Sequence, residues 1–278
     1  MVDTPDGDWY AFMFQDRGAL GRAPVLMPMH FEDGFPIIGE NGKVPEVVTV
    51  LDTGYQYAAI NGSDDFFYKP DENGQITLKN FWEFNHQQMD DFWSVTENPG
   101  HLRLHSAKLS PTLFQAYNTL TQRTVGPKCA AEVTLRFAHM KNGDVAGIST
   151  FIGNYGFTGV KKENDQFYLI MMGRPAKDTT VFGQFEYENP GLEYARVPIY
   201  GESICLRAEA DFTDKRDLSS FYYKEGDNWQ KLGIDQPMYF KMDLFTGCRF
   251  GLFYYSTEQT GGYVDFSKFQ FFEPKEEG

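Results

Sequence analysis

The alternation of apolar and polar residues is clearest near the end of the chain, between Phe245 and Phe272. Arg249–Tyr255 alternates and is rich in aromatic side chains, and Tyr263–Phe272 alternates again after a polar loop, 256–262, that ends in Gly-Gly. This pattern predicts two adjacent antiparallel strands. Because a hairpin with so many aromatic residues needs a second sheet to cover it, the pattern also predicts a β-sandwich.

Short alternating segments separated by turn residues fill most of the chain before this stretch. Phe221–Gly233 is predicted to be a hairpin that turns at Glu-Gly-Asp-Asn and continues at Trp229. No stretch has a sustained helical period, and only Thr112–Gln122 is ambiguous, so the predicted class is all-β. Further strands are expected at 81–84, 93–97, 102–106, 130–138, 145–152, 156–162, 166–172, 180–187 and 204–211.

The first 75 residues have a different organisation. Strands are expected at 9–15, 23–31 and 35–38, and three strands alone cannot bury both faces of their sheet. Residues 41–75 hold several Gly and Pro residues and acidic pairs. We expect them to be an extended linker, either ordered on the sandwich or a flexible tether. The predicted division is therefore 1–40, 41–75 and 76–278.

Charge and cysteine content limit the possible partners and location. The 278 residues carry a net charge of −14, which argues against binding to nucleic acid or to an anionic membrane and suits a neutral polymer such as a polysaccharide. Cys129, Cys205 and Cys248 cannot all pair and form no CxxC motif. We expect free thiols, which favour the cytoplasm and leave secretion open. The sequence has no apolar run long enough for a membrane span and no signal peptide at its start.

Two motifs carry a family resemblance. The F-Y-Y-x-x-G-x-x-W-x-x-L-G segment at Phe221–Gly233, followed by G-x-R-x-G-L-F-x-Y-S and G-G-Y-x-D-F, resembles the C-terminal concanavalin A-like sandwich of glycoside hydrolase family 43. Some of these sandwiches are also classed as carbohydrate-binding module family 91. This resemblance covers about Leu78 to Pro274, and Asp3–Gly39 is similar to the last blade of that family's five-bladed propeller. The implied fold is a concanavalin A-like jelly roll preceded by a partial propeller blade.

The resemblance implies a function connected with β-xylosidases and arabinofuranosidases, which degrade plant cell wall polysaccharides. In that family the catalytic carboxylates lie on earlier blades, and the acidic residues of 1–40 are not at the motif positions. We therefore expect a chain without hydrolytic activity that binds xylan or xylo-oligosaccharides as an accessory module. The alternative is a structural domain that completes and narrows the active site of a propeller, which would then be its partner. A sandwich-fold hydrolase would need an E-x-D-x-x-E strand, and the sequence has none.

Two candidate residues come from the resemblance to the propeller and its closing loop. Arg22, in Leu-Gly-Arg, matches the arginine that reaches toward the bound sugar in the family, where a guanidinium donates fixed hydrogen bonds. Phe245 occupies the place of an aromatic residue that narrows the active site and excludes water. Phe245 is equally expected as a core residue at the start of a strand.

The remaining candidates lie in the sandwich. Sugar binding needs flat aromatic faces and planar polar groups, and two segments offer both. The expected glycan contacts are Tyr117, Asn118, Gln122, Arg123 and Tyr155. Concanavalin A-like sandwiches often hold Ca²⁺ through an Asp near the last strand, so Asp265 is the candidate metal ligand, with a hydrogen bond to a nearby amide as the simpler alternative.

Overall fold

The computed structural model describes residues 1–50, 52–175, 187–239 and 246–274. Over these residues the chain consists of antiparallel strands with four short 3-10 turns, which confirms the all-β prediction. It divides into two compact units, one made of residues 1–17 and 21–58 and the other of residues 18–20 and 59–278. None of the described helices is long and apolar enough to cross a membrane.

The first unit is a four-stranded antiparallel sheet in the order β1-β2-β3-β4. Its strands are β1 (Val2–Asp3), β2 (Trp9–Asp16), β3 (Arg22–Glu32) and β4 (Phe35–Ile38). Successive side chains of a strand point to opposite faces of the sheet. On β2, Phe12 and Phe14 are 63% and 60% exposed on one face, and Met13 is 48% exposed on the other. Large apolar side chains therefore meet solvent on both faces.

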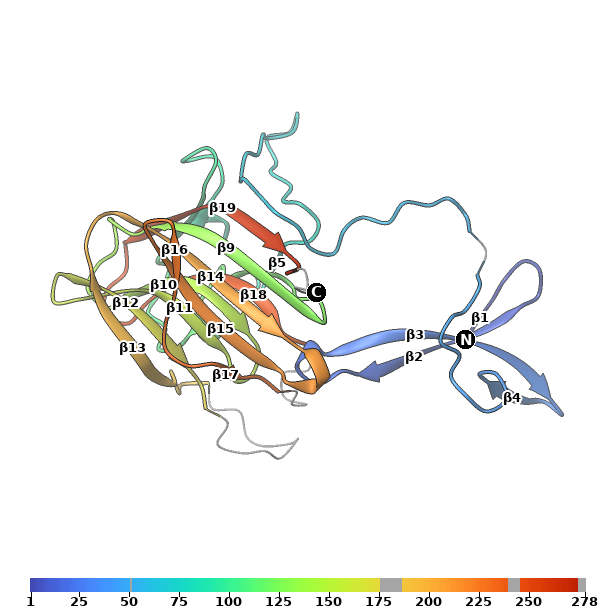
Figure 1. The fold of residues 1–278 in the computed structure, drawn as a ribbon. Helices are drawn as coiled ribbons and strands as arrows, with labels where there is room; N and C mark the ends of the chain where they lie inside the picture. The colour runs from blue at the N-terminus through green and yellow to red at the C-terminus, as the bar shows by residue number, and fades with distance from the viewer. Residues whose placement is uncertain (51, 176–186, 240–245, 275–278) are drawn as a thin grey trace. The chain divides into compact units, whose positions relative to one another are not determined.

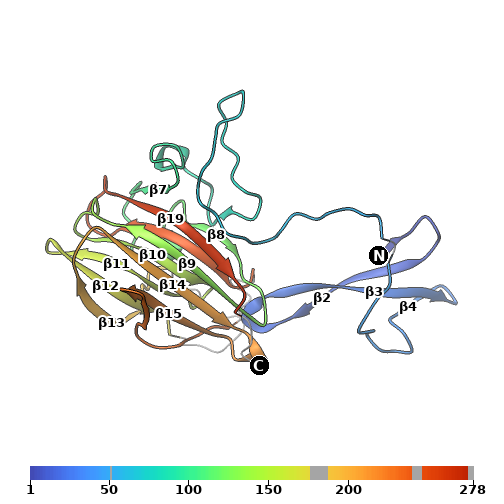
Figure 2. The same cartoon turned by 45° about the horizontal axis from the view of Figure 1, so that its top comes forward.

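The second unit is a sandwich of two antiparallel sheets, which Figures 1 and 2 show as two stacked layers of long strands. The seven-stranded sheet runs, in spatial order, β13 (Leu192–Ile199), β12 (Gln166–Gly173), β11 (Gly156–Glu163), β10 (Asp144–Phe151), β18 (Arg249–Ser256), β8 (Leu120–Arg123) and β5 (Glu83–Phe84). The eight-stranded sheet runs β16 (Asn228–Lys231), β15 (Leu218–Glu225), β14 (Ser203–Asp211), β9 (Lys128–Arg136), β19 (Tyr263–Phe272), β7 (Leu102–His105) and β6 (Trp93–Ser94), with β17 (Gln236–Pro237) beside β15. The 3-10 turns are η1 (Gly18–Leu20), η2 (Asp90–Phe92), η3 (Leu113–Gln115) and η4 (Thr213–Lys215).

The main core lies between the two sheets and follows the alternation of the central strands. On β9 the inward side chains are small or branched, as at Val133 and Leu135, and on β18 they are larger and include Phe250 and Tyr254. Small side chains of one sheet thus pack against large side chains of the other at this point. Core side chains of this size each contribute about 1.5–3 kcal/mol when they are removed from water.

A second apolar cluster covers the other face of the seven-stranded sheet. Val145, Phe157 and Phe253 belong to it, and their sequence neighbours on the strands face the main core. The η3 segment supplies Leu113 and Phe114 to the same cluster. Every residue of β10 is therefore buried, and part of the outer face of this sheet is closed by packing.

The two C-terminal strands correct the first prediction. β18 pairs with β10 and β8 in one sheet, whereas β19 pairs with β9 and β7 in the other. They are not an adjacent antiparallel pair, because the intervening loop carries the chain from one layer to the other. The hairpin at β15 and β16 is confirmed, with Glu225 opposite Asn228.

The predicted linker, 41–75, is divided between the two units. Residues up to 58 belong to the first unit, and those from 59 belong to the sandwich. Asp64 anchors this second part, because its backbone N–H and C=O both bond to Phe269 of β19, at 2.9 and 3.0 Å. From Ala59 onward the segment therefore belongs to the sandwich unit.

Candidate functional site

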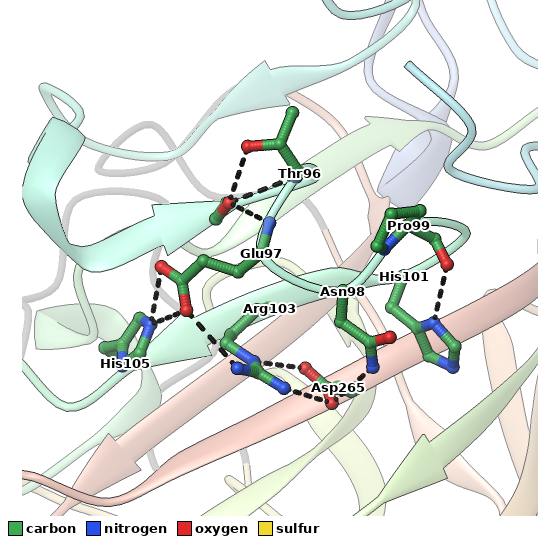
Figure 3. Close-up of polar contacts among 9 residues, drawn as sticks. Thr96, Glu97, Asn98, Pro99, His101, Arg103, His105 and Asp265 are labelled. Carbon is green, nitrogen blue, oxygen red and sulfur yellow. Dashed lines mark hydrogen bonds and ion pairs between the residues drawn. The ribbon is translucent and has the colours of Figure 1, made fainter. Parts of the chain in front are cut away.

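A network of hydrogen-bonded polar side chains surrounds Asp265, one of the predicted site residues, and we call it the Asp265 cluster (Figure 3). It consists of Asp265 on β19, Arg103 and His105 on β7, and Glu97 and Asn98 in the segment before β7. The strand register places Arg103 directly opposite Asp265. Leu102 and Leu104 point into the core, so Arg103 and His105 share the outer face of β7, as strand alternation requires.

The carboxylate of Asp265 is held by two charged hydrogen bonds from one guanidinium. Arg103 donates from Nε to Oδ1 at 2.7 Å and from Nη2 to Oδ2 at 2.8 Å, and Asn98 donates from Nδ2 to Oδ2 at 2.9 Å. The guanidinium also lies 4.1 Å from the ring centroid of Tyr263. The Asp265 side chain is 7% exposed and that of Arg103 is 17% exposed. Paired, planar contacts of this kind are stronger than neutral hydrogen bonds and fix the orientation of both side chains.

The electrostatics of the pair follow from these contacts. Burial raises the pKa of the Asp265 carboxyl, but the hydrogen bonds from Arg103 and Asn98 outweigh it and leave the pKa below its ordinary value. The hydrogen bond to Asp265 in turn raises the pKa of Arg103. Glu97 lies at the solvent side and accepts from Arg103 Nη1 at 3.3 Å and from the ring of His105 at 3.1 Å. Both members of the central pair are thus charged at neutral pH.

This arrangement does not fit the Ca²⁺ expected at Asp265. Calcium requires six to eight oxygen ligands, whereas both carboxylate oxygens here already accept from a guanidinium. Within the described ranges, no three or more His, Cys, Asp or Glu side chains are grouped as metal ligands. The positive charge beside Asp265 comes from Arg103. The simpler alternative, an Asp bonded to a nearby amide, is present through Asn98.

The structure does not bring the predicted glycan contacts of 117–123 together. Asn118 is 1% exposed, and its amide group accepts from and donates to the backbone of Met89 at 2.9 and 3.0 Å. Gln122 is fully buried, and its amide group makes the same two-way contact with the backbone of Gly62, at 3.1 Å each. Both side chains are therefore buried and hold two distant segments of the chain, which leaves them without an exposed surface for a sugar. Tyr117 is half-buried with Lys108 Nζ 4.3 Å from its ring centroid, and Arg123 is exposed.

The other predicted residues are also dispersed. Tyr155 is fully buried in the second apolar cluster, and its hydroxyl donates a hydrogen bond to Pro190 O at 3.0 Å, so no surface of it is exposed to a glycan. Arg22, in the first unit, donates from Nε to Asp16 Oδ1 at 2.7 Å and lies 4.6 Å from the ring of Phe14. Phe245 lies outside the described residues.

Arg103 is the residue that the sequence analysis missed. Its signal was present in the pattern Leu-Arg-Leu-His at 102–105, where two leucines alternate with two polar side chains that must share a face. The pattern does not reveal which strand lies beside this one in the sheet. Only the pairing of β7 with β19 shows that the outer face of one strand meets Asp265 on the other.

The sequence of residues 71–272, well over half of the chain, matches the protein family described as the β-xylosidase C-terminal concanavalin A-like domain. The chain belongs to this family. The match contains the whole Asp265 cluster and begins within the segment that Asp64 anchors. It confirms the resemblance that the hairpin motifs indicated.

Curated relatives agree and are considerably longer. The chain is 27% identical over 306 residues to a β-xylosidase of Formosa agariphila, with 98% of this chain and 47% of the relative covered. It is 29% identical over 174 residues to a putative β-xylosidase of Xylanibacter ruminicola, with 63% of this chain and 32% of the relative covered. The chain thus spans about half or less of the length of these relatives.

Solved structures support the same assignment. A bifunctional GH43-CE protein from Bacteroides eggerthii superimposes with a TM-score of 0.83 at 37% identity, covering 99% of this chain and 34% of that one. A GH43 glycoside hydrolase engineered for endo-xylanase and exo-arabinofuranosidase activity gives a TM-score of 0.81 at 27% identity, covering 98% and 53%. Both units of the chain therefore have counterparts in glycoside hydrolase family 43 proteins.

Proposed function

We propose that the chain is the non-catalytic C-terminal part of a family 43 β-xylosidase or arabinofuranosidase, and that its first unit completes a β-propeller. The observation that carries the proposal is the exposure of apolar side chains on both faces of the four-stranded sheet. Phe12, Phe14 and Phe35 are 60–71% exposed, and Met13 is 48% exposed. A propeller blade buries both faces against the blades on either side of it.

The energetics favour a specific covering partner. Soluble monomers rarely expose contiguous apolar patches larger than a few hundred Å². Each large apolar side chain that becomes buried contributes about 1.5–3 kcal/mol, so a few such residues on each face suffice to hold a neighbouring blade. The remaining length of the family relatives provides room for such blades, since this chain spans 47% of the Formosa agariphila β-xylosidase.

The first prediction is that the purified 278-residue protein does not hydrolyse aryl β-xylosides or aryl α-arabinofuranosides. Glycoside hydrolysis needs two carboxyls on opposite sides of the scissile bond, one of them free to act as an acid. Asp16, the acidic residue nearest to the candidate Arg22, is instead held by that guanidinium. Release of 4-nitrophenol above that of a heat-denatured control, and its loss in an Asp16→Ala variant, would show that the chain has its own active site.

The second prediction tests whether the apolar faces of the first unit are exposed in the isolated protein. The isolated protein is expected to bind the apolar dye ANS, because Phe12 and Phe14 form an uncovered patch. The double substitution Phe12→Ser and Phe14→Ser should lower dye fluorescence at least twofold while the melting temperature of the sandwich stays the same. Leu109→Ser, at a 51% exposed residue of the sandwich, is the matched control and should leave the dye signal unchanged. Equal signals from the double variant and the parent would contradict the uncovered blade.

The second candidate function, binding of xylan or xylo-oligosaccharides, also stays a proposal. It cannot rest on Asn118, Gln122 or Tyr155, which are buried. It is favoured by a groove in the sandwich that places a tryptophan beside planar polar side chains. A neutral glycan also suits the net charge of −14, since it has no charge to be repelled.

A further inference from the structure

A groove lies beside β6, the last strand at one edge of the eight-stranded sheet. Its volume is about 470 Å³, which falls within the 300–1,000 Å³ of typical small-molecule sites. One wall is the turn 71–76, and the other is the segment that runs from Gln88 through η2 into β6. The turn is fixed by its own hydrogen bonds, because Asp71 Oδ1 accepts from the backbone N–H of Asn73 and Gln75 at 2.9 and 2.8 Å. The local shape of this wall is therefore set by the turn itself.

Trp93 distinguishes this groove from the surroundings of the other tryptophans. Trp82 is 7% exposed in the main core, and the guanidinium of Arg207 lies 4.1 Å from the ring of Trp229. Trp93 is half-buried. It packs against the edge of the main core and against Phe84, at a centroid distance of 5.2 Å, and its remaining surface lines the groove. Within the sandwich it is thus the tryptophan whose ring lines an open groove and has no cation over it among the described contacts.

Planar polar groups lie in the same groove. Asp90 Oδ1 accepts from Gln88 Nε2 at 2.6 Å and from Trp93 Nε1 at 3.4 Å, so the three side chains form one connected unit. Gln88 and Asp90 are both exposed. In the described part of the chain, Asp90 Oδ2 and Gln88 Oε1 accept no hydrogen bond, which leaves them available to hydroxyl donors. An aromatic ring flanked by a carboxylate and an amide matches the alternating C–H faces and hydroxyl edges of a sugar.

We propose that this groove is a binding subsite for a neutral β-linked pentose oligosaccharide, with Trp93 stacking on a sugar ring and Gln88 and Asp90 accepting from its hydroxyls. The inference rests on the proposed xylan-binding function and gives it a location. The carboxylate of Asp90 accounts for the preference for a neutral chain, since an uronate in the groove would meet a like charge. The groove lies wholly within the sandwich and uses none of the residues first expected to contact a glycan.

The test is a fluorescence titration of the full chain with xylohexaose. The parent is expected to show a saturable change in tryptophan emission with a Kd of roughly 0.1–1 mM, as stacking on an open groove provides only modest affinity. Trp93→Ala should weaken binding in xylan affinity gels roughly tenfold, the equivalent of one stacked ring. Gln88→Ala and Asp90→Asn alter exposed side chains, so they should weaken binding severalfold without changing the melting temperature.

The matched control is Trp229→Phe, which removes a half-buried tryptophan whose ring is already covered by Arg207. It should bind like the parent and keep the same emission change. If Trp93→Ala, Gln88→Ala and Asp90→Asn all bind xylan like the parent, the subsite is wrong while xylan binding stands. If the parent itself shows no retardation and no emission change at 10 mM xylohexaose, both the subsite and the xylan-binding function are overturned.

Discussion

Replacing Arg103 with alanine is expected to lower the free energy of unfolding by about 3 kcal/mol, because it leaves the buried carboxylate of Asp265 with Asn98 as its remaining side-chain donor. For a domain of this size the loss corresponds to a fall in melting temperature of roughly 6–12 °C. Urea denaturation followed by tryptophan fluorescence measures the first quantity, and calorimetry measures the second.

The chain offers a closely matched control for this variant. Arg136 on β9 stands opposite Asp265 on the other side of β19, but its side chain is 52% exposed and pairs with Glu202 at 3.8 Å. Arg136→Ala should change stability by less than about 0.5 kcal/mol, since exposed ion pairs contribute little. If the two alanine variants were equally stable, the Arg103–Asp265 pair would not be a structural element of the sandwich.

The expected pH dependence has a definite sign. The pKa of Asp265 is lower in the folded protein than in the unfolded chain, so its contribution is fully present above the ordinary carboxyl pKa of about 3.9. The contribution is lost as the pH falls through the lower, folded-state pKa. The stability difference between the parent and Arg103→Ala should therefore be large at pH 7 and shrink below about pH 4.

Treatment with EDTA tests whether the positive charge beside Asp265 comes from the guanidinium of Arg103 or from a metal ion. Because Arg103 supplies the positive charge, EDTA is expected to leave the melting temperature of the parent unchanged. A ligand that binds only the folded state would stabilise it by mass action, so a fall in melting temperature with EDTA that Ca²⁺ reverses would show a calcium site after all.

The double variant Arg103→Leu and Asp265→Leu should recover much of the stability that Arg103→Ala loses, since no charge is then left buried without a partner.

The sequence predicted most of the strands correctly and predicted some of their partners wrongly. Alternation of side chains is local, so it located β18 and β19 within a residue or two. Pairing is not local: β18 is bonded to β10, more than 90 residues earlier in the chain, and no short-range pattern contains that information. β13 was missed for a different reason. It is an edge strand with a Pro and mostly exposed side chains, so its apolar alternation is weak.

The candidate site shows the same limit at the level of side chains. The composition around Tyr117 predicted a glycan contact, whereas Asn118 and Gln122 bond to backbone that is 29 and 60 residues away. A side-chain amide that hydrogen-bonds to the backbone of a distant segment cannot be distinguished, from sequence alone, from a side-chain amide that contacts a sugar. Trp229 is half-buried under Arg207 on an edge strand, so its removal should destabilise the sandwich less than a core substitution does.

Replacing Asp64 with alanine is expected to have an effect as large as that of Arg103→Ala, although Asp64 lies in the predicted linker. Its side chain is fully buried and accepts from the N–H of Phe66 at 2.9 Å, from Trp82 Nε1 at 2.8 Å and from the hydroxyl of Tyr68. Lys79 Nζ lies 3.1 Å from the same carboxylate. Alanine would leave several buried donors without an acceptor, at about 1–3 kcal/mol each, so we expect a total loss of roughly 3–5 kcal/mol.

Asp65 provides the control, because it makes the same local turn at the surface. Its Oδ1 accepts from the N–H of Phe67 at 3.2 Å, and the residue is exposed, so Asp65→Ala should cost less than about 1 kcal/mol. Limited proteolysis gives a second measurement: cleavage between residues 59 and 82 should become faster in Asp64→Ala and stay slow in Asp65→Ala. If both variants were as stable and as resistant as the parent, this segment would be a tether. The large difference in stability that we expect between the two variants would show that Asp64 attaches the segment to β19. The attachment is the backbone pairing of Asp64 with Phe269, which the buried carboxylate of Asp64 holds in place.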